Sequence, residues 1–171
     1  MLSTQEGVPH PDPVVETLTL AAMCPPQPTY KHHLEECVKS GTLSSLQLES
    51  IIYACQRFEG ARLQDAQGSR GGFFLGDGAG VGKGRQIAGL AYEHWRTKGR
   101  RVLWLSVSAD LRHDAARDLD DLGLEPLPLY PARGSAGSLP TGSLDACNVK
   151  DGVLFMTYAL LSTSRDWGVV A

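Results

Sequence analysis

The residues with the clearest chemistry lie in the glycine-rich segment GDGAGVGKGR, residues 76–85. Its glycines carry no side chains, so their backbone N–H groups can approach a phosphate closely, and Lys83 adds a positive charge. A helix that begins here would add the positive end of its dipole. The segment therefore predicts a nucleoside-triphosphate loop, whose binding residues are Gly78, Gly80, Val81, Gly82, Lys83, Gly84 and Arg85.

Two other interpretations of this loop are a flexible turn and a dinucleotide-binding loop. The second requires G-x-G-x-x-G, but the third glycine position is Lys83 after Gly78-x-Gly80 and Arg85 after Gly80-x-Gly82. The match to G-x-x-x-x-G-K-[ST] is itself incomplete, because Asp77 stands at the first glycine position and Gly84 at the hydroxyl position. Since that hydroxyl normally ligates Mg²⁺, either metal binding is rearranged or catalysis is weak.

The elements around the loop must place it between a strand and a helix. The apolar run 73–75 predicts a strand before the loop. Ile87, Leu90, Ala91 and His94 share one face at helical spacing, which predicts a helix over 83–97. Apolar spacing predicts another helix over 45–58, with Ser44 or Ser45 as its N-cap and Gln47 nearby.

Three further apolar runs, over 102–107, 127–130 and 153–158, predict buried strands. Between the first two, Ser108 is expected to cap a helix with an apolar stripe at Leu111, Ala115, Leu119 and Leu122. Strands that alternate with helices predict an α/β fold with a mainly parallel sheet flanked by helices.

The beginning of the chain differs in composition from the rest. Six of the ten prolines fall in the first 30 residues, where they prevent continuous helix or central strand. We expect a proline-rich extended arm over residues 1–40 and one partial domain over 41–171.

Composition and cysteine usage limit the class of protein. There are 16 Lys and Arg residues against 19 Asp and Glu residues, so overall charge predicts no general affinity for nucleic acid. No signal peptide and no apolar run of 18 residues is evident, which predicts a protein that is neither secreted nor bound to a membrane. The four cysteines are expected to be reduced, and a zinc site from Cys24, His32, His33 and Cys37 fits no common pattern, so no structural metal is expected.

Several segments together resemble the strawberry notch proteins. They are GDGAGVGKGR at 76–85, WLSVSADLRHDAARDL at 104–119 and VLFMTYALL at 153–161, with similar stretches at 9–21 and 43–56. These segments cover most of the chain, and G-V-G-K-G-R combined with S-V-S-x-D-L is specific to that family. Gly84 is then a family trait and not a defect.

The resemblance implies a P-loop NTPase of RecA-like fold, specifically a helicase-like ATPase of superfamily two that binds ATP and Mg²⁺. It also implies a nuclear transcriptional co-regulator whose partners are transcription and chromatin regulators; outside the nucleus the chain would be cytoplasmic. Gln47 occupies a place that resembles the helicase Q motif, which contacts adenine; the alternatives are a capping partner or a solvated helix residue.

By the same resemblance, Ser106 to Arg117 corresponds to motif Ia and Thr157-Tyr158 to motif Ib, which face nucleic acid. Arg112 and Arg117 would then contact phosphates. The alternative is that they pair with acidic residues of their own helix, Asp110, Asp114 or Asp118.

The sequence departs from the family at its end. Ala171 comes before any D-E-x-H segment, and no Asp-Glu dipeptide exists to serve as Walker B, so no catalytic residue is assigned. Without a second RecA-like domain, the expected enzyme activity is absent or very weak, and the incomplete sheet is expected to be unstable. Two alternatives remain: a non-catalytic chromatin or transcription interaction module with a remnant P-loop, and an unrelated small P-loop kinase.

Overall fold

The computed structural model describes residues 6–15, 18, 22, 25–60, 71–97, 99–131 and 149–163. Its sheet has three parallel strands in the order β1-β3-β2, with bounds Arg101–Ser106 for β1, Leu129–Pro131 for β2 and Gly152–Thr157 for β3. β1 pairs with β3 from Arg101↔Gly152 to Ser106↔Thr157. The predicted α/β fold with a parallel sheet and flanking helices is confirmed.

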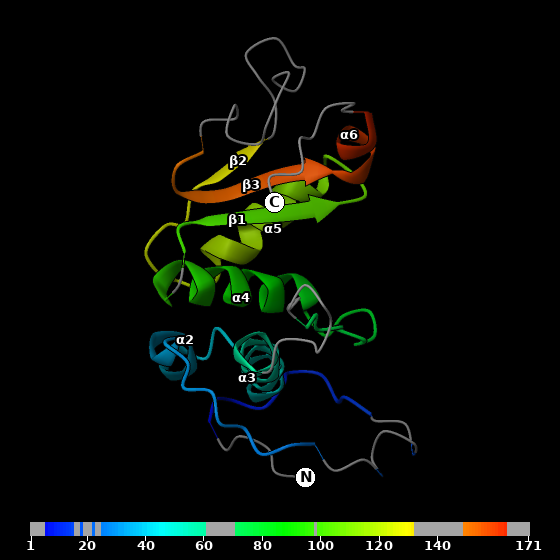
Figure 1. Ribbon diagram of the computed structural model, residues 1–171. Helices are drawn as coiled ribbons and strands as arrows, with labels where there is room; N and C mark the ends of the chain where they lie inside the picture. Colours follow the sequence, from blue (N-terminus) through cyan, green and yellow to red (C-terminus); the bar gives the residue numbers. More distant parts are fainter. Residues whose placement is uncertain are drawn as a thin grey trace, which may run out of the picture.

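The helices form layers on the sheet (Figure 1). α4, Lys83–Thr97, lies between the sheet and the pair α2, Glu35–Ser40, and α3, Ser45–Glu59. α5, Leu111–Asp120, packs beside α4, and the short α6, Tyr158–Thr163, follows β3. α4 is thus a central helix, covered by the sheet on one side and by α3 on the other.

Alternating residues of the strands enter two apolar clusters, as the period of a strand requires. Val102, Trp104 and Val153 pack with α4 in the larger cluster, while Leu154 and Met156 face the other side with residues of α6. The burial of each such side chain contributes about 1.5–3 kcal/mol, so these clusters fix the position of α4 against the sheet.

Local sequence accounts for the two long helices. α4 has the predicted bounds, 83–97. α3 begins with a capping box in which Gln47 N–H donates to Ser44 Oγ and Ser44 N–H donates to Gln47 Oε1. The interpretation of Ser44 as N-cap is confirmed.

Two local expectations were wrong, and one helix was missed. Residues 73–75 form no strand, because no described strand pairs with them, and Phe74 is 89% exposed. Ser108 does not cap α5; the N-cap is Asp110, whose N–H donates to Ser108 Oγ. α6 was missed, although Thr157 Oγ1 accepts from Leu160 N–H at its start.

The first 40 residues are not all extended. α2 lies at 35–40, and Leu34 and Cys37 are fully buried in the larger apolar cluster. The preceding segment is held by side chains of other helices: Thr29 N–H donates to Gln56 Oε1 at 2.7 Å, and Tyr30 Oη donates to Glu93 Oε1 at 2.7 Å. This segment therefore packs on α3 and α4.

Candidate functional site

The glycine-rich loop leads into α4 at the edge of the sheet toward which the arrows of β1 and β3 point (Figure 1). Ligands of open α/β sheets bind at this carboxyl edge. Gly80 and Gly82 have φ angles of 89° and 82°, which other residues rarely adopt, so the loop requires glycine at both positions. The chain therefore turns at two glycines directly before the first turn of α4.

Lys83 folds back onto this loop. Its Nζ donates hydrogen bonds to the backbone oxygens of Asp77 at 2.8 Å and Gly78 at 2.7 Å. These two acceptors are neutral carbonyls, whereas a phosphate would add the attraction between opposite charges. The lysine is thus placed beside the loop and can exchange these carbonyls for an anion.

Gln47 connects α3 to the loop. Its side chain is 8% exposed; Oε1 accepts from Ser44 N–H, and Nε2 donates to the backbone oxygen of Val81 at 3.0 Å. A Cβ on Gly82 would overlap Nε2 of Gln47, so the loop and α3 are in direct contact. The capping interpretation of Gln47 is confirmed, and its contact with adenine stays a prediction.

Gly84 faces a carboxylate from α5. A Cβ built on Gly84 would overlap Oδ2 of Asp118, so this oxygen occupies the space that the side chain of a P-loop Ser or Thr would fill. Burial raises the pKa of the Asp118 carboxyl above its usual value, despite the opposing effect of Arg117 and Arg85. A side chain at position 84 would therefore force the Asp118 carboxylate to move.

Arg85 points away from the loop. Its guanidinium donates to the backbone oxygen of Thr42 at 3.1 Å and pairs with Asp121. These contacts join the start of α4 to the end of α5 and to the turn before α3. Arg85 is thus engaged in an ion pair with Asp121, and its contact with nucleotide stays a prediction.

Gln86 and Asp77 add a second polar contact at the loop. Nε2 of Gln86 donates to Asp77 Oδ2 at 2.9 Å, and this bond ties the loop to the first turn of α4. Gln86 is fully buried, and its Oε1 has no hydrogen-bond partner among the described residues. An unpaired buried oxygen of this kind is costly and indicates that a donor or a water belongs at this place.

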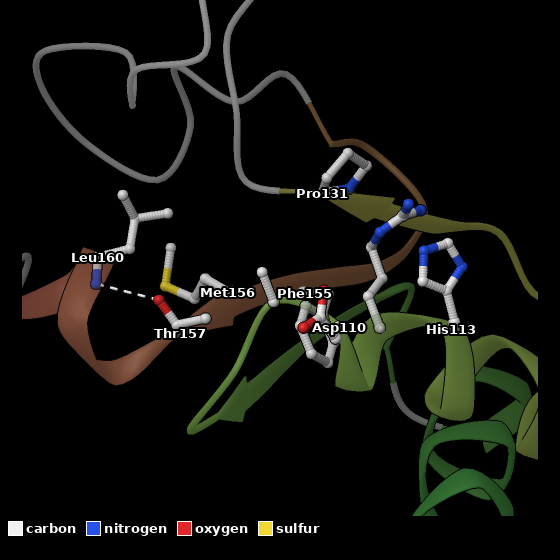
Figure 2. A pocket seen from close by; sticks show the side chains of 9 residues that line it. Asp110, His113, Pro131, Phe155, Met156, Thr157 and Leu160 are labelled. Atoms are coloured by element: carbon white, nitrogen blue, oxygen red, sulfur yellow. Dashed lines mark hydrogen bonds between the residues drawn. The ribbon is translucent and has the colours of Figure 1, made fainter.

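Apart from the loop, the structure has a pocket near the ends of β2 and β3 (Figure 2). This pocket of about 420 Å³ is formed by Pro131 and Thr157 at strand ends, Leu160 of α6 and Asp110 and His113 at α5, together with Ala109, Arg112, Phe155 and Met156. Arg112 thus lies at a pocket, whereas Arg117 pairs with Asp114 at 3.0 Å on its own helix. For Arg117 the alternative of a pair within the helix is confirmed.

The residues considered for zinc have other contacts, and Cys24 lies outside the described residues. His32 Nε2 is 2.9 Å from Glu6 Oε2, and His33 Nδ1 is 2.8 Å from Glu93 Oε1. Within the described part of the chain, no cluster of three His, Cys, Asp or Glu side chains could hold a metal ion. Among the same residues, no helix is long and apolar enough to cross a membrane.

The sequence interpretation missed Asp118, Asp121 and Gln86. A signal for Asp118 exists, because it lies three residues after Ala115 and four before Leu122, and so on the buried stripe of α5. An acidic residue on an apolar stripe indicates a specific partner. No comparable signal exists for Asp121, which follows the last turn of α5.

Comparison with known proteins adds three findings. The family described as P-loop containing NTP hydrolase pore-1 matches residues 9–168. The chain is 50% identical over 166 residues to Protein FORGETTER 1 of Arabidopsis thaliana and 46% identical over 168 residues to strawberry notch homolog 1 of Homo sapiens. Each alignment covers 95% of this chain but only 12% of the relative. No solved structure matches the chain.

Proposed function

The chain belongs to the family of P-loop NTP hydrolases to which the strawberry notch proteins are homologous, and from this premise we propose that it binds ATP together with Mg²⁺. The observation that carries the proposal is the loop at the start of α4, with Gly80 and Gly82 at positive φ and Lys83 beside it. The triphosphate would lie against the backbone N–H groups there, where the helix dipole favours an anion.

Lys83 would leave the carbonyls of Asp77 and Gly78 and bind a phosphate oxygen. Val81, Gly78 and Gly84 would contribute the rest of the cradle, and an ideal Cβ on Gly78 or Gly80 would meet no atom within 4 Å, so space is available there. The residues also fit Mg²⁺, a cation that prefers oxygen ligands, because a carboxylate of α5 lies at Gly84. When bound, the metal neutralises charge on the phosphates.

We further propose that this nucleotide site serves a larger nuclear protein, a helicase-like co-regulator of transcription with chromatin partners. The support is the similarity over 95% of this chain to relatives of which it spans 12%. Within such a protein the pocket at Arg112 would face nucleic acid, and hydrolysis would depend on a Walker B carboxylate and a second domain.

The test of nucleotide binding is a titration with a fluorescent ATP analogue in Mg²⁺. For Lys83→Ala we expect binding weaker by about 10- to 100-fold, because a hydrogen bond to a charged group contributes about 1.5–3 kcal/mol. Lys39→Ala is the matched control, since Lys39 is an exposed lysine at the end of α2. Equal affinity of Lys83→Ala and wild type would contradict the proposal.

That contrary result would favour the second candidate, an interaction module with a remnant loop. Its specific support is that Lys83 is already bonded within the loop and that Asp77 replaces the usual glycine. In that case partner binding would be the same in wild type and in Lys83→Ala, and neither would respond to ATP. Turnover with transfer of phosphate to an acceptor would instead indicate a kinase.

A further inference from the structure

Asp118 of α5 occupies a position where P-loop proteins carry a metal ligand. Its Oδ2 lies where a Cβ on Gly84 would be, and Gly84 directly follows Lys83. In the usual loop this residue is Ser or Thr, whose hydroxyl ligates Mg²⁺. An oxygen is therefore present at this place, although it comes from another helix.

The carboxylate of Asp118 makes no hydrogen bond or ion pair in the described part of the chain, although the charges of Arg117 and Arg85 act on it from a longer distance. The two neighbouring cations are engaged elsewhere: Arg85 pairs with Asp121 and with the carbonyl of Thr42, and Arg117 pairs with Asp114. A half-buried carboxylate without a hydrogen bond or an ion pair is unfavourable. A bound cation would satisfy it.

We propose that the Asp118 carboxylate is the protein ligand of nucleotide-bound Mg²⁺, in place of the P-loop hydroxyl that Gly84 lacks. The proposal rests on the proposed binding of ATP. Mg²⁺ commonly binds one or two carboxylates together with phosphate oxygens and waters, and Asp118 beside the loop supplies this combination. Gly84 is then needed for the metal site, because any larger side chain would displace the carboxylate.

This arrangement has a consequence that a purely structural Asp118 would lack. Without metal, the carboxylate repels the triphosphate, so ATP binds poorly; with metal, the same carboxylate attracts the complex. Asp118→Asn should therefore bind ATP more tightly than wild type in EDTA and less tightly in Mg²⁺. A change confined to packing would shift both affinities in the same direction.

The experiment is a titration of the full chain with the fluorescent ATP analogue, once in EDTA and once in Mg²⁺. The measured quantity is the metal ratio, defined as the dissociation constant in EDTA divided by the dissociation constant in Mg²⁺. We expect Asp118→Asn to reduce this ratio by about tenfold or more, whereas Asp118→Glu keeps most of it. Asp120→Asn is the matched control, because Asp120 is an exposed carboxylate on the same helix.

A swap of the ligand completes the design. In Gly84→Ser combined with Asp118→Ala, the hydroxyl returns and the carboxylate is gone, so the metal ratio should recover relative to Asp118→Ala alone. Circular dichroism identifies any variant that fails to fold, and Mn²⁺ paramagnetic resonance with ATP reports directly on the metal in the folded ones. A metal ratio in Asp118→Asn equal to that of wild type overturns the inference, while wild type that binds no ATP in either buffer overturns the proposed function instead.

Discussion

Glu93 holds the N-terminal segment onto α4, and this contact gives a sharp prediction for stability. Its carboxylate is 1% exposed; Oε1 accepts from Tyr30 Oη at 2.7 Å and lies 2.8 Å from His33 Nδ1, and Oε2 accepts from His33 N–H at 3.0 Å. The perturbation is Tyr30→Phe, which removes one hydroxyl and leaves the two contacts to His33.

The expected magnitude follows from the kind of bond that is lost. A hydrogen bond to a charged group contributes about 1.5–3 kcal/mol, while a neutral one contributes about 0.5–1.5 kcal/mol. We therefore expect Tyr30→Phe to lower the free energy of unfolding by about 1.5–3 kcal/mol. The matched control is Tyr53→Phe, because Tyr53 Oη donates to the backbone oxygen of Pro26 at 3.0 Å in an exposed, uncharged bond.

The assay is equilibrium unfolding in urea, followed by far-ultraviolet circular dichroism. A double-mutant cycle of Tyr30→Phe with Glu93→Gln isolates the pair, since both residues belong to one network. The reasoning is refuted if Tyr30→Phe is no more destabilising than Tyr53→Phe, or if the two substitutions of the cycle are additive. Either result would mean that the N-terminal segment is not held by the buried carboxylate.

A pH series and the substitution of Gly89 test the packing around α4. Burial and the neighbouring Glu93 raise the pKa of Tyr30 above its ordinary value of 10.0, so the folded state keeps a proton that the unfolded state loses. The free energy of unfolding should therefore fall as the pH rises above 10. Urea denaturation at several pH values should show a smaller fall in Tyr30→Phe. A Cβ on Gly89 would lie 2.5 Å from Ile51 Cδ1, so Gly89→Ala should destabilise the protein by about 1–3 kcal/mol through overpacking, despite the higher helix propensity of Ala. Adding Ile51→Val, which removes that methyl group, should recover part of the loss, and strict additivity in urea unfolding would contradict this account.

The parts of the fold that depend on local patterns were predictable from sequence. The apolar face of α4 gave its exact bounds, and Ser44 with Gln47 gave the start of α3. Both signals act within one or two helical turns. The run at 73–75 has the composition of a strand, but a strand also needs a partner for its hydrogen bonds, and composition carries no information about that partner.

The candidate site also combines residues that local sequence identifies with residues that only the packing of the helices brings together. Contiguous residues, Gly80 to Lys83, were found from their types and spacing alone. Asp118 is 34 positions beyond Gly84 in the sequence and reaches it only because α5 packs on α4. Gln47 shows the intermediate case, since its capping bond is local and its bond to Val81 joins α3 to the loop before α4.

The departure of the loop from the usual motif at Gly84 has a physical explanation. A residue with a side chain at 84 would collide with Asp118, and a loop without a hydroxyl at 84 needs another oxygen for the metal; Gly84 and Asp118 meet both conditions together. Arg85 is held by Asp121 at the end of α5 and by the backbone oxygen of Thr42. Gly84→Ser alone should therefore disturb Asp118, whereas Gly84→Ser combined with Asp118→Ala should supply an oxygen for the metal without the collision.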